Sequence, residues 1–219
     1  MNIRAVVFDL DGTLYPYRRI VLRSLPIVLR YPRFLRAFAR ARRRLRDLRP
    51  IANLHEAQAQ LVSAQLGVNL TQTRELIEQL IYHDWPECFR GLPPFPGVAE
   101  VLNQLRRRGL RLAVLSDLPV HPKLDYLGLA GYWDCALTSE TTNYLKPNPE
   151  PFRYAASQLE VGLESILFVG NSYPYDIQGA QTLGMTTAHL SRAPRRRPGA
   201  DVTFSRFHSF LSAVEPLLG

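Results

Sequence analysis

The sequence predicts an α/β fold in which a parallel β-sheet core carries an inserted α-helical segment. Apolar strand-like runs and helix-like runs alternate from about residue 93 onward, an order typical of parallel sheets with helical crossovers. Residues 16–90 show helical spacing only, whereas the apolar run 5–8 before them indicates a strand buried on both faces. We therefore expect a discontinuous core domain, residues 1–15 and 92–219, and an α-helical cap domain, residues 16–91.

The helical insertion is expected to begin with short helices or a kinked one, because Pro26 and Pro32 interrupt its first half. Residues 54–66 then form an amphipathic pattern that ends at Gly67, and another helical pattern runs from about Thr71 towards Trp85. An insertion that leaves the sheet directly after its first strand must lie over the carboxyl edge of that sheet. The sequence thus predicts a lid above this edge.

The core is expected to contain five further strands and five helices. The predicted strands are 110–115, 135–138, 166–169, 186–190 and 202–204, and the predicted helices are 97–108, 123–127, 149–159, 177–183 and 207–218. An exposed basic loop is expected at residues 192–197.

The net charge of +8 is concentrated in one segment. Residues 18–49 contain twelve Arg and a single acid, Asp47, a local charge of +11, so the other residues together carry −3. The favoured interpretation is a solvated helix face. Two others stay open: Arg18 or Arg19 contacts a second anionic group of a substrate, or the segment attaches to an anionic partner such as nucleic acid or a membrane surface. We expect no nucleic-acid partner.

Several classes of protein are disfavoured by composition. No stretch approaches the about 20 apolar residues of a membrane span, and the chain opens on a strand without a leader pattern, so a cytoplasmic protein is expected. Cys88 and Cys135 form no Cys-x-x-Cys unit and are expected to be reduced. The five His residues lack metal-ligand spacing, which disfavours zinc. The oligomeric state is left open.

The chemistry is expected where the first strand ends, in the run Asp-Leu-Asp-Gly-Thr at 9–13. Residues i and i+2 of a strand point the same way, so Asp9 and Asp11 should lie side by side. In open α/β sheets, ligands bind at this carboxyl edge. Two adjacent carboxylates repel each other unless a cation lies nearby or one of them is protonated.

Three further polar positions fall at or near strand ends on the same edge. Ser116 ends an apolar run, Lys146 precedes a helix in Lys-Pro-Asn-Pro, and Gly170-Asn171 with Asp176 joins a strand to a helix. Each position alone is ordinary: a strand-end Ser or a lone Asp is most often a helix cap. Their order along the chain makes the set specific.

With these four motifs the chain resembles the haloacid dehalogenase (HAD) superfamily, in particular its phosphatase branch with a helical (C1-type) cap. Residues 9–14 match motif one, Ser116 motif two, Lys146 motif three and residues 170–176 motif four. The resemblance covers the whole core and implies a HAD-like Rossmannoid sheet. It also implies a Mg²⁺-dependent phosphatase that acts on a small phosphorylated metabolite.

The resemblance also implies roles for the motif residues. Asp9 would be the nucleophile that forms an aspartyl-phosphate, and Asp11 would protonate the leaving oxygen and then activate water. The phosphoryl oxygens would be bound by polar groups of motifs one to three, namely Thr13, Ser116, the backbone N–H of Asp117, and Lys146. Mg²⁺ would be held by oxygens of motifs one and four, namely Asp9, the carbonyl of Asp11, and Asn171 or Asp176.

Two residues refine this expectation. Members of the superfamily that cleave carbon–halogen bonds lack the acid at the position of Asp11, since a halide leaves without a proton. Asp11 therefore favours phosphoester hydrolysis. Asn171 stands where the family often has Asp, and a neutral amide holds Mg²⁺ less strongly than a carboxylate, so weaker metal affinity is expected. A catalytically weak protein that binds an anionic partner through its Arg-rich cap, and a phosphomutase, remain the alternatives.

Overall fold

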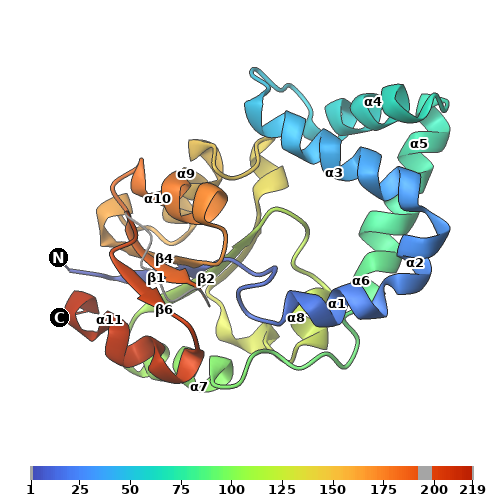
Figure 1. Ribbon diagram of the computed structural model, residues 1–219. Helices are drawn as coiled ribbons and strands as arrows, with labels where there is room; N and C mark the ends of the chain where they lie inside the picture. The colour runs from blue at the N-terminus through green and yellow to red at the C-terminus, as the bar shows by residue number, and fades with distance from the viewer. Residues whose placement is uncertain (1, 192–198, 219) are drawn as a thin grey trace.

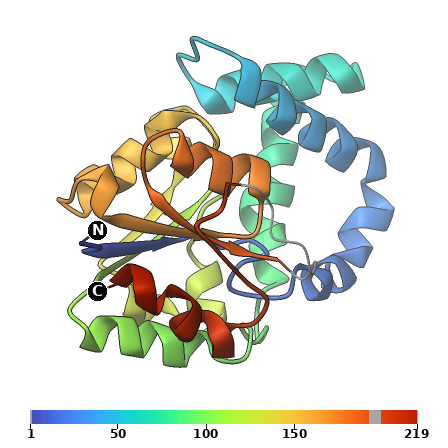
Figure 2. The ribbon, with the colours of Figure 1, turned by 60° about the vertical axis from the view of Figure 1, so that its left-hand side comes forward.

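The computed structural model describes residues 2–191 and 199–218, and it shows a six-stranded parallel sheet with helices on both faces (Figures 1 and 2). The predicted basic loop 192–197 lies outside the described residues. The strands are β1 (Ala5–Phe8), β2 (Arg111–Ser116), β3 (Cys135–Thr138), β4 (Ile166–Gly170), β5 (Thr186–Leu190) and β6 (Val202–Phe204). Their positions agree closely with those expected from the apolar runs.

The sheet has the order β3-β2-β1-β4-β5-β6, and every neighbouring pair is parallel. The predicted α/β fold is therefore confirmed. The chain moves from β1 outward to β3 and then returns to β4 on the other side of β1. Phe8 aligns with Val114 of β2 and with Val169 of β4. Motifs one, two and four therefore leave the sheet at one level, at the switch point where open α/β sheets bind ligands.

Alternate residues of β1 enter two apolar clusters on opposite faces of the sheet. Val6 and Phe8 belong to the cluster covered by α7 (Val98–Arg107) and α11 (Phe210–Leu218). Ala5 and Val7 belong to the cluster beneath α9 (Pro149–Gln158) and α10 (Gln178–Gln181). All four residues are fully buried. Burial on both faces explains why this strand is apolar throughout, without polar alternation.

The insertion between β1 and α7 consists of helices, which we call the cap segment. They are α1 (Tyr17–Arg23), α2 (Leu25–Arg30), α3 (Pro32–Asp47), α4 (Leu54–Leu66), α5 (Leu70–Ile77), the π-helical η1 (Glu78–Asp84) and α6 (Trp85–Glu87). Pro26 and Pro32 lie in the first turns of α2 and α3, where a missing N–H costs nothing. They separate short helices, as expected. Gly67 ends α4 in the left-handed conformation.

The cap segment has an apolar core of its own, formed mainly by α3, α4 and α5. Its buried members include Phe34, Phe38, Val62 and Ile77. A smaller cluster joins Leu45, Ile51 and Leu54 of the cap segment to Leu145 of the core. In Figure 1 the cap segment lies on the side of the core opposite the two chain termini.

The remaining short elements complete the core. They are α8 (Lys123–Tyr126), the 3₁₀ turns η2 (Ala130–Tyr132), η3 (Ser139–Thr142), η4 (Leu163–Ser165) and η6 (Phe207–Ser209), and the π-helical η5 (Tyr173–Ile177). Neither Cys88 nor Cys135 forms a disulfide, as predicted. Within residues 2–191 and 199–218, no helix is both long and apolar enough to cross a membrane.

Candidate active site

Asp9 lies one residue beyond β1, where its N–H donates to the carbonyl of Val169 at 2.8 Å and so continues the pairing with β4. Its side chain is 8% exposed. One carboxylate oxygen accepts from Lys146 Nζ at 2.8 Å, and the other accepts from Thr13 Oγ1 at 2.7 Å. Motifs one and three therefore fix the orientation of this carboxylate.

Lys146 connects three of the four motifs. Besides Asp9, its ammonium donates to Asp176 Oδ1 at 2.6 Å and to the carbonyl of Leu115, at the end of β2, at 3.2 Å. The other oxygen of Asp176 accepts from the backbone N–H of Ser172 at 2.9 Å. Asp176 thus holds the lysine and the motif-four turn together.

The charges in this cluster shift the pKa values of their neighbours. Burial raises the pKa of Asp9 to about 7, helped by the nearby Asp176 and only partly opposed by Lys146. Burial alone would lower the pKa of Lys146, but the adjacent Asp176 and Asp9 outweigh it and raise that pKa. Lys146 therefore stays charged, while Asp176 and Asp11 oppose the ionisation of Asp9.

Asp11 has a separate set of partners. Lys123 Nζ donates to both of its carboxylate oxygens, at 3.0 Å each. Tyr15 OH donates to Oδ1 at 2.6 Å and Ser116 Oγ to Oδ2 at 2.8 Å. Burial would raise the pKa of Asp11, but Lys123 and the hydrogen bonds together lower it. The Asp11 side chain keeps 27% exposure, so it stays accessible from outside the core.

Tyr15 and Lys123 were not among the residues predicted for the site. Both side chains are almost completely buried. Burial and the neighbouring Asp11 raise the pKa of Tyr15, so it remains a donor. The sequence did hold a signal for Lys123, since only two of the 27 basic residues are lysines and the other is Lys146.

Asn171 packs against the motif-one turn. Gly12 has φ of +90°, and a Cβ at that position would lie 2.6 Å from Asn171 Nδ2. Thr13 Oγ1, which donates to Asp9, also lies 3.2 Å from Asn171 Oδ1. The carboxylate of Asp9 and the amide oxygen of Asn171 are therefore brought to a single hydroxyl.

This donor set fits a magnesium ion. Mg²⁺ prefers oxygen ligands, uses few carboxylates and retains waters. Asp9, Asn171 and the backbone carbonyl of Asp11 are oxygen donors of this kind, and a bound cation would offset the burial and the neighbouring carboxylate that raise the pKa of Asp9. Each oxygen of Asp9 and of Asp176 accepts one hydrogen bond from the protein, so both carboxylates keep lone pairs that a metal could use. Among the described residues, no cluster of three or more His, Cys, Asp or Glu side chains suits a metal, so an all-carboxylate site is not formed.

Ser116 and Asp117 of motif two lie at the same edge of the sheet, where both form hydrogen bonds with other segments. Ser116 Oγ donates to Asp11 and accepts from the N–H of Leu118 at 3.2 Å. Asp117 Oδ1 accepts from the N–H of Lys146 at 3.1 Å, and Asp117 Oδ2 forms an ion pair with Arg46 of α3 at 2.5 Å. All eight predicted residues are thus brought to one edge of the sheet.

Arginines near the end of α3 hold the cap segment on motif two. Arg42 pairs with buried Glu140 and also donates to the carbonyl of Asp117. Arg46 lies over the ring of Tyr175, 4.1 Å from its centroid. Part of the basic segment is therefore used in contacts with the core and is not merely solvated.

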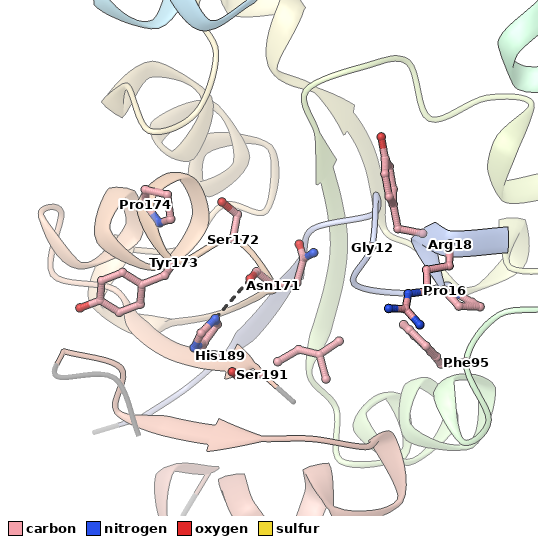
Figure 3. Close-up of a pocket in the computed structure, with 12 residues that line it drawn as sticks. Gly12, Pro16, Arg18, Phe95, Asn171, Ser172, Tyr173, Pro174, His189 and Ser191 are labelled. Atoms are coloured by element: carbon pink, nitrogen blue, oxygen red, sulfur yellow. Dashed lines mark hydrogen bonds between the residues drawn. The ribbon is translucent and has the colours of Figure 1, made fainter. Parts of the chain in front are cut away.

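A cavity of about 490 Å³ opens beside motifs one and four. In Figure 3, Asn171, Ser172 and Tyr173 line one side of it and Pro16, Arg18 and Phe95 the other. His189 Nε2 lies 3.2 Å from the carbonyl oxygen of Asn171, the contact drawn as a dashed line. The lining includes Gly12 and Asn171 but not Asp9 or Lys146, so the cavity flanks the carboxylates. Arg19 is exposed and outside the lining.

Known proteins resemble this chain in sequence and in fold. Residues 3–184 match the family model of haloacid dehalogenase-like hydrolases. Glyceraldehyde 3-phosphate phosphatase of Methanopyrus kandleri is 31% identical over 199 residues, covering 87% of this chain and 84% of that protein. Pyrophosphatase PpaX of Bacillus cereus is 25% identical over 196 residues with the same coverage. A 2-haloacid dehalogenase structure from Pseudomonas syringae superposes with a TM-score of 0.71 at 23% identity, over 98% of this chain and 99% of that one, which shows a shared fold.

Proposed function

Because this chain belongs to the haloacid dehalogenase-like hydrolases, we propose that it is a Mg²⁺-dependent phosphatase that acts on a small phosphorylated metabolite. The observation that carries the proposal is Asp11. It lies two residues from the candidate nucleophile, is bound by three side chains and keeps 27% exposure. A carbon–halogen bond needs no such acid, because a halide leaves without a proton. An alkoxide leaving group does need one.

Asp9 is proposed as the nucleophile. Its carboxylate is buried and oriented by Thr13 and Lys146, so attack on phosphorus needs no prior reorientation. A P–O bond forms to Asp9 as the bond to the leaving oxygen breaks. Lys146 supplies one fixed positive charge next to the carboxylates of Asp9 and Asp176.

Mg²⁺ is proposed to be held by Asp9, Asn171 and the backbone carbonyl of Asp11. When bound, the ion would offset the repulsion between the carboxylates and an anionic phosphoryl group. Thr13 keeps the oxygens of Asp9 and Asn171 together. Asp176 contributes indirectly, because it accepts a hydrogen bond from the Lys146 ammonium that also donates to Asp9.

Asp11 is proposed to transfer the protons. It would give a proton to the leaving oxygen in the first step and take one from the water that hydrolyses the aspartyl-phosphate in the second. Its lowered pKa, which Lys123 and the hydrogen bonds to Tyr15 and Ser116 produce, leaves it ionised at neutral pH. The resting side chain is therefore in the form that the second step requires, and the proton that it gives in the first step must be taken up when the substrate binds, from a singly protonated phosphate group of that substrate.

A small substrate is proposed, and the cavity beside motif four, of about 490 Å³, has room for a small metabolite. Glyceraldehyde 3-phosphate, the compound in the name of the relative from Methanopyrus kandleri, belongs in the test panel. Arg18 lines the cavity and would suit a second anionic group of a substrate.

The test is a panel of phosphorylated metabolites and p-nitrophenyl phosphate, assayed for phosphate release with and without Mg²⁺. The wild type is expected to hydrolyse at least one compound only with Mg²⁺, and Asp9→Asn, with an unchanged fold by circular dichroism, to hydrolyse none. A wild type that is inactive across a broad panel would favour the alternative of an anion-binding protein. Transfer of phosphate between two carbons of one sugar, without release, would identify a phosphomutase.

A further inference from the structure

The first two cap helices carry an unusual amount of exposed apolar surface. Among the described residues, the large apolar side chains that stay exposed are Tyr17, Val21, Leu22, Leu25 and Leu29, all on α1 and α2. Leu22 is 65% and Leu29 76% exposed. We call this surface the α1–α2 face. Single exposed apolar residues are ordinary, but a contiguous group marks an interaction site.

The geometry of the two helices places these side chains on one side. Ser24, at the junction, donates its N–H to the carbonyl of Ile20 at 2.8 Å, and Val28 donates to Ser24 at 2.9 Å. Ser24 therefore closes the last turn of α1 and the first turn of α2, and the two helices meet at this residue. Exposed apolar residues recur every four positions from 17 to 29, and Ile20 and Ser24 between them are buried. Figure 1 shows α2 at the outer margin of the molecule, and α1 connecting it to the core beside α8.

The charge of this surface is uniformly positive. Arg18, Arg19 and Arg30 are exposed on the same two helices, whereas the guanidinium of Arg23 donates to backbone carbonyls at residues 88–91. The chain has no acidic residue between Asp11 and Asp47. An apolar stripe bordered by arginines is the pattern of helices that lie in a membrane interface, where the arginines meet anionic headgroups.

We propose that the α1–α2 face binds the surface of a membrane that contains anionic lipids, without spanning it. Charge complementarity selects this occupant. In a symmetric dimer through the same face, the arginines of two copies would meet without an acidic partner from this segment. The four aliphatic side chains also protrude instead of lining a groove for a peptide, since the cavity nearby reaches only Tyr17 and Arg18 of α1.

The test is sedimentation of the full-length protein with vesicles of phosphatidylcholine alone or with about 30% phosphatidylglycerol. The protein is expected to bind the anionic vesicles only. The double variant Leu22→Glu/Leu29→Glu should bind at least about tenfold more weakly, because its apolar stripe is lost. Both side chains are exposed, so the phosphatase activity on a soluble substrate should not change.

Two double arginine variants distinguish binding through the α1–α2 face from binding that depends only on the net charge of the protein. Arg19→Gln/Arg30→Gln and the control Arg107→Gln/Arg153→Gln remove the same charge from exposed positions, the control pair on α7 and α9. Only the first pair is expected to weaken binding strongly. Failure of the wild type to bind anionic vesicles would overturn the proposal. Equal losses of vesicle binding in the two double arginine variants, with no loss in the double leucine variant, would also overturn it. So would a dimer in analytical ultracentrifugation that the double leucine variant dissociates, if the protein did not bind vesicles.

Discussion

Lys123 donates to both carboxylate oxygens of Asp11, at 3.0 Å each, from a position 112 residues further along the chain. The lysine is 2% exposed, whereas Asp11 keeps 27% exposure. A buried cation thus holds the inner side of a carboxylate that remains accessible. Asp11 therefore differs from Asp9 in its cationic partner, since Asp9 pairs with Lys146. Each motif-one carboxylate therefore has a lysine of its own, and the two residues are prepared for different roles.

Lys123→Met is expected to lower kcat on the order of 100-fold with little change in KM, because Asp11 loses the contacts that position it. Steady-state kinetics on the best substrate of the panel measures this. Lys123→Arg, which keeps the charge, should recover part of kcat. Thermal melting controls for folding, since the lysine is buried. Equal activity of Lys123→Met and wild type would show that the pair has no role in turnover.

The stability gained from Mg²⁺ should grow with pH. Without metal, the folded-state pKa of Asp9, about 7, lies above its ordinary value of 3.8. The folded state therefore binds this proton more tightly than the unfolded one, and stability is lost as pH rises from about 4 through about 7. Mg²⁺ binds the ionised form and restores stability over the same range.

Melting temperatures with Mg²⁺ and with a chelator, at about pH 5 and about pH 7.5, measure this effect. The difference between the two conditions should be larger at the higher pH, and in Asp9→Asn it should be small at both. A difference that is the same at both pH values in the wild type would count against Asp9 as a ligand.

Asn171→Asp should need less Mg²⁺ for half-maximal turnover, because a carboxylate binds the ion more strongly than an amide oxygen. The side chain is nearly the same size, so its packing against Gly12 should be kept. Activity measured across a Mg²⁺ titration gives the answer. An unchanged or higher requirement would indicate that Asn171 does not contact the metal.

Arg42→Met should lower the free energy of unfolding by about 3–5 kcal/mol, because it leaves Glu140 buried without its cation. Urea unfolding measures this loss. Arg42→Met/Glu140→Met should recover most of it, since no buried charge then remains. Arg43→Met is the matched control, because Arg43 is exposed on the same helix and should change stability by no more than about 0.5 kcal/mol. A similar loss for Arg42→Met and Arg43→Met would rule out the buried pair as the cause.

The sequence was most informative where a pattern is local. The apolar runs predicted the strands of the parallel sheet, and the carboxyl ends of parallel strands share an edge. That rule brought Asp9, Ser116 and Asn171 together before any contact was known. Ser116 was expected to bind a phosphoryl oxygen, and the structure shows that it also donates to Asp11.

The two residues that were missed contact Asp11 from outside the four motifs, Lys123 from far along the chain and Tyr15 from four residues away. Lys123 reaches Asp11 from a helix of four residues, and Tyr15 reaches it from the turn after motif one. No periodicity links these positions. The pairing of Arg46 with Asp117 likewise joins two segments 71 residues apart. Composition showed that the basic segment was unusual, but only packing shows which arginines touch the core.

The most direct test of the central claim is to trap the phosphorylated enzyme. The protein is mixed with ³²P-labelled substrate and Mg²⁺, quenched in acid during turnover and digested, and the labelled peptide is sequenced by mass spectrometry. The account predicts a label on Asp9 in the wild type, its loss on addition of hydroxylamine, and no label in Asp9→Asn. Label on another residue, or phosphate release by Asp9→Asn at the wild-type rate, would contradict it.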